Sequence, residues 1–217
     1  QTIGVIGGTG SGKTSLINMI PRFYDATKGE VLVNGTNVKE YTEEGLRNKI
    51  GIVPQKAVLF KGTIRSNLLW GNESATENDL MEALKQAQSY DFVMQKENGI
   101  DSVVEQNGRN FSGGQRQRLT IARALVRKPE ILILDDSSSA LDYTTDANLR
   151  KEIAKLKDMT VFIVSQRTAS IMDADQIVVL DDGNVMGIGT HKDLLENCEV
   201  YKEIYESQFK KPEKEGM

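Results

Sequence analysis

The segment GGTGSGKT at residues 7–14 matches the phosphate-binding pattern G-x-x-x-x-G-K-[ST] at every fixed position. Its glycines allow a tight turn in which successive backbone N–H groups point at an anion. Lys13 supplies a positive charge for the β- and γ-phosphates of a nucleotide, and Thr14 offers a hydroxyl to Mg²⁺. We therefore expect these residues and the one after them to bind nucleotide phosphates: Gly7, Gly8, Thr9, Gly10, Ser11, Gly12, Lys13, Thr14 and Ser15.

The sequence on either side of this loop supports the same interpretation. Residues 2–6 are short, apolar and branched, as in a buried strand, and residues 15–20 resemble the start of a helix. The positive N-terminal end of a helix favours phosphate. A glycine-rich turn without a ligand is the alternative, but it does not require a strand before it and a helix after it.

Composition limits the class of protein. A length of 217 residues favours one domain and allows two small ones, and the net charge of −4 gives no sign of general nucleic-acid affinity. The single cysteine, Cys198, excludes an internal disulfide and suits a reducing compartment. Apolar runs such as 131–134 are far shorter than the ~20 residues of a membrane helix. Because the chain begins with Gln1 and enters a strand at once, we expect it to be part of a longer protein.

Strand and helix patterns alternate at both ends of the chain and give way to helices in the middle. Short apolar runs predict strands at 30–33, 50–53, 131–134, 161–164 and 177–180. Capping residues and proline predict helices at 76–88 and 112–127. Asn34-Gly35 and Asp182-Gly183 are turn signals, and Thr190 with Asp193 caps a further short helix. The sequence therefore predicts an α/β fold with a mostly parallel sheet and a helical insert.

Two carboxylates follow the predicted strand at 131–134. A buried strand that ends in a carboxylate beside a phosphate loop is the usual arrangement for holding Mg²⁺. We expect Asp135 to bind the metal directly or through water. The alternative is that Asp135 only caps a helix.

A second anion site is indicated at residues 111–115. Ser112 is followed by two glycines at the start of a predicted helix, which leaves backbone N–H groups available. Ser112 lies 100 residues after Gly12. The chain could fold the two sites together, the second could serve the nucleotide of another chain, or the glycines could form only a flexible cap.

These segments together resemble the nucleotide-binding domain of an ATP-binding cassette (ABC) transporter of the exporter type. Residues 111–115 resemble the L-S-G-G-Q signature, with Phe111 in place of Leu, and residues 53–55 resemble the Q-loop. The D-loop sequence S-A-L-D is present as Ser139, Ala140, Leu141 and Asp142. Residues 61–68 and 105–108 are similar to exporters, although the second segment departs from the usual G-E-x-G. The resemblance covers residues 1 to 207.

The resemblance implies a P-loop NTPase fold with a RecA-like core, a helical signature subdomain and a small antiparallel β portion truncated at the N-terminus. We expect one ABC ATPase domain, with the core at 1–61 and 128–207, the helical subdomain at 62–127 and a charged tail at 208–217. A transmembrane domain and an aromatic residue that stacks on adenine are expected upstream of Gln1. The expected location is the cytoplasmic face of the cell membrane.

The family also implies a head-to-tail dimer that binds ATP and Mg²⁺ between the phosphate loop of one cassette and the signature of the other. Phe111, Ser112, Gly113, Gly114 and Gln115 would then contact the partner's ATP. Thr14, Gln55 and Asp135 would hold the metal, and Gln55, Asp136 and Gln166 would be the catalytic residues. The expected partners are a second cassette and the transmembrane domains of the transporter, with no nucleic acid.

Two residues depart from the family pattern. The family usually has Glu at position 136 and His at position 166, where this chain has Asp136 and Gln166. Asp136 is shorter by about 1–1.5 Å, and a displacement of ~1 Å can cost on the order of 10²-fold in rate. Gln166 can donate a hydrogen bond but carries no positive charge. We therefore hypothesise a slow site in a heterodimer, the alternatives being a normally active homodimer or a regulatory module that binds ATP without turnover.

Other residues and classes are less informative. Phe23, Tyr24, Trp70 and Phe92 are expected to be core or docking aromatics, and His191 is expected to be structural. A DNA-repair ATPase would need a long coiled-coil insertion before the signature, a translation factor would carry two cassettes, and an importer subunit would lack the exporter-like segments. The sequence does not indicate the transported substrate.

Overall fold

Six strands form the central sheet of the computed structural model, which describes residues 1–209; the predicted tail after Phe209 lies outside them. The strand order is β10-β9-β1-β8-β7-β4, and every neighbouring pair is parallel except β10 with β9. The predicted mostly parallel sheet is confirmed. The strands are β1 (Thr2–Gly7), β4 (Ile50–Val53), β7 (Ile131–Asp135), β8 (Thr160–Val164), β9 (Gln176–Asp181) and β10 (Asn184–Gly189).

Both faces of the sheet are covered, which explains its near-continuous apolar strands. In β7, Leu132 and Leu134 pack into one hydrophobic cluster, while Ile133 between them packs into the cluster on the opposite face. The Ile133 face is closed by α1 (Lys13–Asn18), η1 (Val38–Glu40) and α2 (Glu43–Asn48). The other face is closed by α7 (Tyr143–Ala154), α9 (Glu199–Phe209) and the helices of the middle segment.

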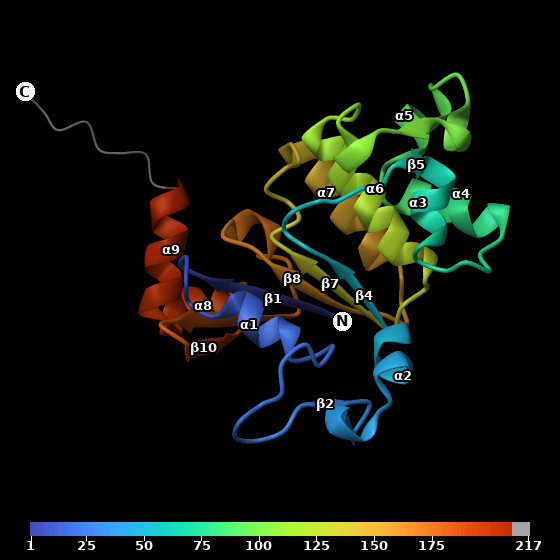
Figure 1. The fold of residues 1–217 in the computed structure, drawn as a ribbon. Helices are drawn as coiled ribbons and strands as arrows, with labels where there is room; N and C mark the ends of the chain where they lie inside the picture. The colour runs from blue at the N-terminus through green and yellow to red at the C-terminus, as the bar shows by residue number, and fades with distance from the viewer. Residues whose placement is uncertain (210–217) are drawn as a thin grey trace, which may run out of the picture.

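The middle segment forms a group of helices beside β4 and β7, coloured cyan to yellow-green in Figure 1. It contains α3 (Ile64–Leu69), α4 (Glu77–Gln86), α5 (Tyr90–Met94), η2 (Gly99–Asp101), η3 (Gln106–Gly108) and α6 (Gly113–Val126). The helices predicted at 76–88 and 112–127 are confirmed as α4 and α6. The short antiparallel pair of β5 (Gly62–Thr63) and β6 (Val103–Val104) was not expected from sequence, because two-residue strands carry no periodic signal.

Local capping and turn chemistry agrees with the sequence analysis in most places. Thr76, Ser112 and Thr190 each form a capping box with the residue three positions later. The predicted strand at 30–33 is shorter than expected, because only β2 (Leu32–Val33) pairs with β3 (Thr36–Asn37). Asn34 and Gly35 form the turn between them with φ of 51° and 75°. The helix predicted from residue 15 already begins at Lys13.

The C-terminal part of the described chain packs against the end of the sheet. A 3-10 turn, η4 (Thr168–Ser170), follows β8, and α8 (His191–Asn197) follows β10. Helix α9 contacts both β9 and η4, and it reaches Phe209, two residues past the predicted end of the core. His191 Nδ1 lies 2.7 Å from the hydroxyl of the buried Tyr201, so His191 joins the start of α8 to α9. Within residues 1–209, no helix is long and apolar enough to cross a bilayer.

The close approach of α3 and α6 provides a test of the packing in the helical group. A Cβ at Gly71 would lie 2.1 Å from the backbone oxygen of Arg123 in α6. We expect Gly71→Ala to lower the free energy of unfolding by about 1–3 kcal/mol, because the two backbones would have to separate. Gly113→Ala is the control, since a Cβ there meets nothing within 4 Å. Thermal unfolding measures both, and an equal loss of stability in the two variants would contradict the packing.

Candidate functional site

The phosphate loop connects β1 to α1 and leaves its backbone N–H groups accessible. Gly10 and Gly12 have φ of 83° and 95°, the left-handed region that favours glycine. Gly12 is the N-cap of α1, and no side chain caps this helix. A Cβ at Gly8 or Gly10 would meet nothing within 4 Å, so the loop faces open space. The loop therefore has uncapped N–H groups at the start of α1, and the phosphate binding expected of them stays a prediction.

Lys13 folds back over the same loop. Its Nζ donates to the carbonyl oxygens of Gly7 and Gly8 at 2.9 and 2.7 Å, and to Ser11 Oγ at 3.3 Å. Burial lowers the pKa of Lys13, while the nearby charges of Asp136 and Asp135 act in the opposite direction. The ammonium group thus lies on the loop among acceptors, close to Asp135 at the end of β7 and to Asp136 directly after it.

Thr14 and Asp135 meet although they are 121 positions apart in the chain. Thr14 Oγ1 donates to Asp135 Oδ2 at 3.1 Å and lies 3.4 Å from Oδ1. Burial raises the pKa of Asp135, although the Thr14 hydrogen bond lowers it in part. A hydroxyl and a carboxylate are oxygen ligands of the kind that Mg²⁺ prefers. These two residues therefore fit the metal that the sequence predicts.

Gln55 and Asp136 form a second pair beside the first. Gln55 follows β4, and its Nε2 donates to Asp136 Oδ2 at 3.0 Å. Asp136 follows β7 with φ of 45°, and its N–H donates to the carbonyl of Val164 at 2.9 Å. Left-handed backbone is more often adopted by Asp than by larger residues such as Glu. The backbone at this position thus suits Asp136, although its carboxylate reaches less far.

Gln166 follows β8, next to the strand that carries Asp136. Its side chain is exposed and makes no hydrogen bond within residues 1–209. Its backbone oxygen accepts a hydrogen bond from Gln208 Nε2 at 2.7 Å. Gln166 thus lies just after the carboxyl end of β8, and its catalytic role stays a prediction.

The signature segment begins α6 in the helical group. Ser112 Oγ accepts from the Gln115 N–H at 3.2 Å, and Gln115 Oε1 accepts from the Ser112 N–H at 3.0 Å. A Cβ at Gly114 would lie 3.2 Å from Ala140 O, so the signature lies against the D-loop. Asp142 ends that loop as the N-cap of α7. Within the described chain, no hydrogen bond joins residues 111–115 to residues 7–15, so the two predicted anion sites are not bonded to each other.

Several residues contact the site although the sequence does not indicate these contacts. The Gly183 N–H, in the turn between β9 and β10, donates to Ser11 O of the phosphate loop at 3.2 Å. The buried Ser170 lies 3.3 Å from both Ser138 and Asp146 and links η4 to the segment that follows Asp136. The turn at Asp182-Gly183 was predicted, but a turn signal does not tell which distant loop the turn will contact.

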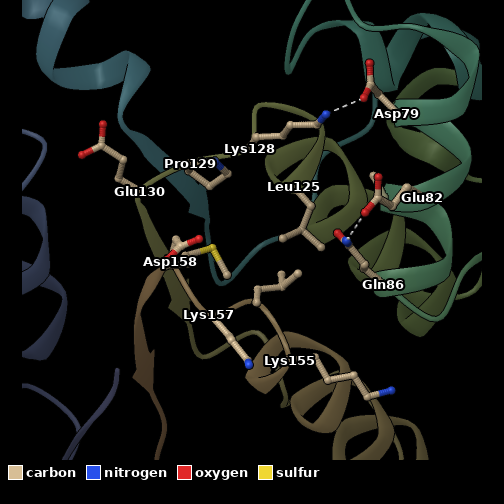
Figure 2. A pocket seen from close by; sticks show the side chains of 13 residues that line it. Asp79, Glu82, Gln86, Leu125, Lys128, Pro129, Glu130, Lys155, Lys157 and Asp158 are labelled. Atoms are coloured by element: carbon tan, nitrogen blue, oxygen red, sulfur yellow. Dashed lines mark hydrogen bonds and ion pairs between the residues drawn. The ribbon is translucent and has the colours of Figure 1, made fainter.

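A hollow of about 580 Å³ lies elsewhere, between α4, the end of α6 and the turn before β8, as Figure 2 shows. Lys128 pairs with Asp79 at 2.6 Å, and Gln86 donates to Glu82 at 3.2 Å. None of the predicted site residues lines it. The hollow is therefore separate from the candidate site.

The carboxyl groups of Asp135 and Glu130 have pKa values that the fold shifts in opposite directions, which gives a testable contrast in stability. Because the folded state raises the pKa of Asp135, the ionised form is unfavourable there, and stability rises as pH falls through the folded pKa. Asp135→Asn should therefore leave the unfolding temperature at pH 7 unchanged or higher, while it weakens Mg²⁺ binding by about tenfold or more, through loss of a charged ligand.

Glu130→Gln is the matched control. Lys49 and Asn34 lower the pKa of Glu130, so its charge stabilises the fold above its usual pKa, and this contribution is lost as pH falls through the folded pKa. This variant should lower the unfolding temperature at pH 7 and leave Mg²⁺ binding unchanged. Thermal unfolding and Mg²⁺ titration measure both variants, and a larger loss of stability for Asp135→Asn would contradict the assignment.

Comparisons with known proteins agree with this geometry. Residues 1–139 match the family model described as ABC transporter. The chain is 47% identical over 209 residues to the uncharacterized ABC transporter ATP-binding protein YfiB of Bacillus subtilis (strain 168). It is 42% identical over the same length to a putative multidrug export ATP-binding/permease protein of Staphylococcus aureus (strain NCTC 8325 / PS 47). Each alignment covers 96% of this chain and 36% of the relative.

A solved structure shows the same fold. A bacterial Atm1-family ABC exporter with ATP bound superposes with a TM-score of 0.93 at 34% sequence identity. The match covers 97% of this chain and 37% of that one, so the chain spans little more than a third of the proteins it resembles. With the phosphate loop, the carboxylates at the end of β7 and the signature helix all in place, the chain belongs to the ABC transporter family.

Proposed function

We propose that this chain is the ATP-binding and ATP-hydrolysing cassette of an exporter, in which ATP-driven dimerisation of two cassettes powers transport across a membrane. The observation that carries the proposal is the meeting of Thr14 with Asp135 and of Gln55 with Asp136 at one edge of the sheet. The names of the relatives, an ATP-binding/permease protein for multidrug export and an ABC exporter with ATP bound, support the same function.

The residues of the edge divide into binding and hydrolytic groups. Lys13 and the uncapped N–H groups of the loop bind the phosphates, and Thr14 with Asp135 holds Mg²⁺. The metal supplies neutralisation of the phosphate charge when it is bound. Gln55 and Asp136 orient the attacking water, and Gln166 donates a hydrogen bond to the γ-phosphate.

A head-to-tail dimer accounts for the position of the signature. Ser112 and the glycines after it are not bonded to the phosphate loop of their own chain. Within residues 1–209, the backbone N–H groups of Gly113 and Gly114 make no hydrogen bond, whereas that of Ser112 donates to Gln115 Oε1. The two glycine N–H groups are therefore available to the ATP of a second cassette. The contact of Gly114 with Ala140 places the D-loop next to the signature, so both segments belong to the same face of the cassette.

The partner cassette is proposed to be non-identical. The binding half of the site, residues 7–14 with Asp135, has the full family pattern, whereas Asp136 and Gln166 weaken the hydrolytic half. The left-handed backbone at residue 136 suits Asp, but the shorter side chain places the carboxylate farther from water. This chain then forms a slow site of its own and completes a faster site with its signature. A homodimer with normal hydrolysis and a regulatory module without turnover are the alternatives.

A groove between the core and the helical group is the proposed contact with the transmembrane domain, at the cytoplasmic face of the membrane. It measures about 290 Å³, and Phe60 and Trp70 stack in it with their ring centres 4.7 Å apart. Phe23, Phe60 and Trp70 are exposed by 42 to 66%, which is unusual for large apolar side chains unless a partner covers them. Arg123 Nη1 is buried there without a hydrogen-bond partner, so the groove suits an apolar segment that also supplies an acceptor.

A slow site in this chain and a faster site in its partner predict different losses of ATP turnover when the catalytic carboxylate of each site is removed. In the assembled transporter, Asp136→Asn should lower ATP turnover by less than about twofold, because the slow site contributes little to the total. Substitution of the partner's catalytic acidic residue by the corresponding amide residue should lower ATP turnover by on the order of 10²-fold or more. Steady-state ATPase measurements compare the two, and the reverse order would show that this chain carries the faster site.

Substitution of Asp136 by Glu, which is longer by one methylene group, tests whether the short side chain slows hydrolysis. Asp136→Glu should raise hydrolysis at this chain's own site, by up to about 10²-fold if a ~1 Å displacement is what slows it. The measurement is single-turnover hydrolysis with the partner's site inactivated, and Asp136→Asn serves as the control. An unchanged rate together with unchanged ATP binding would locate the defect outside residue 136.

A further inference from the structure

The side chain of Gln208, near the end of α9, holds the backbone that carries Gln166. Its Nε2 donates to the carbonyl of Gln166 at 2.7 Å. Its Oε1 accepts from the N–H and from the hydroxyl of Thr168, at 2.9 and 2.8 Å. Both ends of one amide are thus engaged with two residues that are 40 and 42 positions away in the chain.

The same segment is held from the other side by buried polar groups. Thr168 and Ser170 are buried, and Ser170 Oγ lies 3.3 Å from Ser138 Oγ and from Asp146 Oδ2. Arg167 Nη1 donates to Ser138 O at 3.4 Å. Residues 166–170 are therefore fixed between the segment after Asp136 on one side and α9 on the other. On the α9 side, the Gln208 amide makes three hydrogen bonds to this segment.

Helix α9 is anchored well enough to act as a support. Tyr201 is completely buried, and its hydroxyl lies 2.7 Å from His191 Nδ1 on α8. Ile204, one turn later, packs against the same hydrophobic cluster. Gln208 lies a further turn along the helix, so its Cα position follows from this packing. The side chain of Gln208 is exposed, so each of its hydrogen bonds contributes modestly to stability and can be exchanged for a bond to water.

We propose that Gln208 is a positioning residue, which sets the orientation of residues 166–168 so that the side chain of Gln166 faces the γ-phosphate. The proposal rests on the proposed function, in which Gln166 donates a hydrogen bond there. The phosphate loop shares no hydrogen bond with Gln208, so the residue acts on hydrolysis and not on ATP binding. Displacement of α9 releases the segment, which makes this helix a point through which hydrolysis can be controlled.

The first experiment measures the contact itself, by hydrogen–deuterium exchange at the Thr168 amide in the assembled transporter. Gln208→Ala removes the acceptor, and exchange should rise by about two- to tenfold, the loss of one partly exposed hydrogen bond. Gln208→Glu keeps an acceptor for Thr168 but loses the donor to Gln166, so exchange should rise less. Glu203→Ala, an exposed position on the same helix, is the control and should leave exchange unchanged. Unchanged exchange in Gln208→Ala would overturn the proposal.

The second experiment measures hydrolysis at this chain's own site, with the partner's catalytic carboxylate changed to its amide. Gln208→Ala and Gln208→Glu should both lower kcat by about three- to tenfold with KM for ATP unchanged, since both lose the bond to Gln166. Gln166→Ala should lower kcat as well, and Gln208→Ala should add nothing to it, because the two residues act in series. Glu203→Ala should have no effect.

The outcomes separate this inference from the proposed function. If Gln166→Ala slows hydrolysis and Gln208→Ala does not, or if their effects multiply, only the positioning role of Gln208 is wrong. If Gln166→Ala has no effect, the proposed role of Gln166 in hydrolysis is wrong, and the positioning role fails with it. A rise in KM without a change in kcat would also overturn the proposal, since it would place Gln208 in ATP binding.

Discussion

The parallel alignment of β1, β8, β7 and β4 is the constraint on which the rest of the structure depends. Val164 pairs with Val5 on one side and with Asp135 on the other, and Val53 pairs with Leu134. This register places the carboxyl ends of four strands at one edge of the sheet, where open α/β sheets bind their ligands. The phosphate loop, Gln55, both carboxylates and Gln166 all follow one of these ends. A shift of one residue would turn each side chain to the opposite face.

On this rigid edge, the site is assembled from modest polar contacts. The bonds between Thr14 and Asp135, between Gln55 and Asp136, and between Gln208 and Gln166 each join different elements of the fold. Contacts of this kind contribute about 0.5–1.5 kcal/mol each, so the sheet and its two hydrophobic clusters supply the stability, and the polar contacts supply orientation. Such an arrangement suits residues that must exchange their partners for a ligand.

The helical group carries the signature segment and not the phosphate loop. It shares the hydrophobic cluster that covers one face of the sheet, and capping boxes begin several of its helices. The start of α6 lies against the D-loop and shares no hydrogen bond with the chain's own phosphate loop. The cassette therefore has two separate regions, the sheet edge with the phosphate loop and the face with the signature segment. Asp136 combines a favourable backbone with a short side chain. Its left-handed backbone conformation suits Asp, but the Asp side chain extends its carboxylate less far than Glu would.

The sequence by itself determined the local features: the phosphate loop from its glycines, the parallel strands from their continuous apolar runs, and the helix starts at Thr76, Ser112 and Thr190 from their caps. These follow from interactions within a few residues. It also indicated Asp135 and Asp136, because a strand end next to a carboxylate is a local pattern. Only the tertiary structure decided that Gln55 bonds Asp136, that Gly183 supports the phosphate loop and that Gln208 holds residues 166–168. Those contacts join positions that the chain brings together through sheet register and helix packing, and such proximity leaves no periodic or compositional trace in the residues themselves.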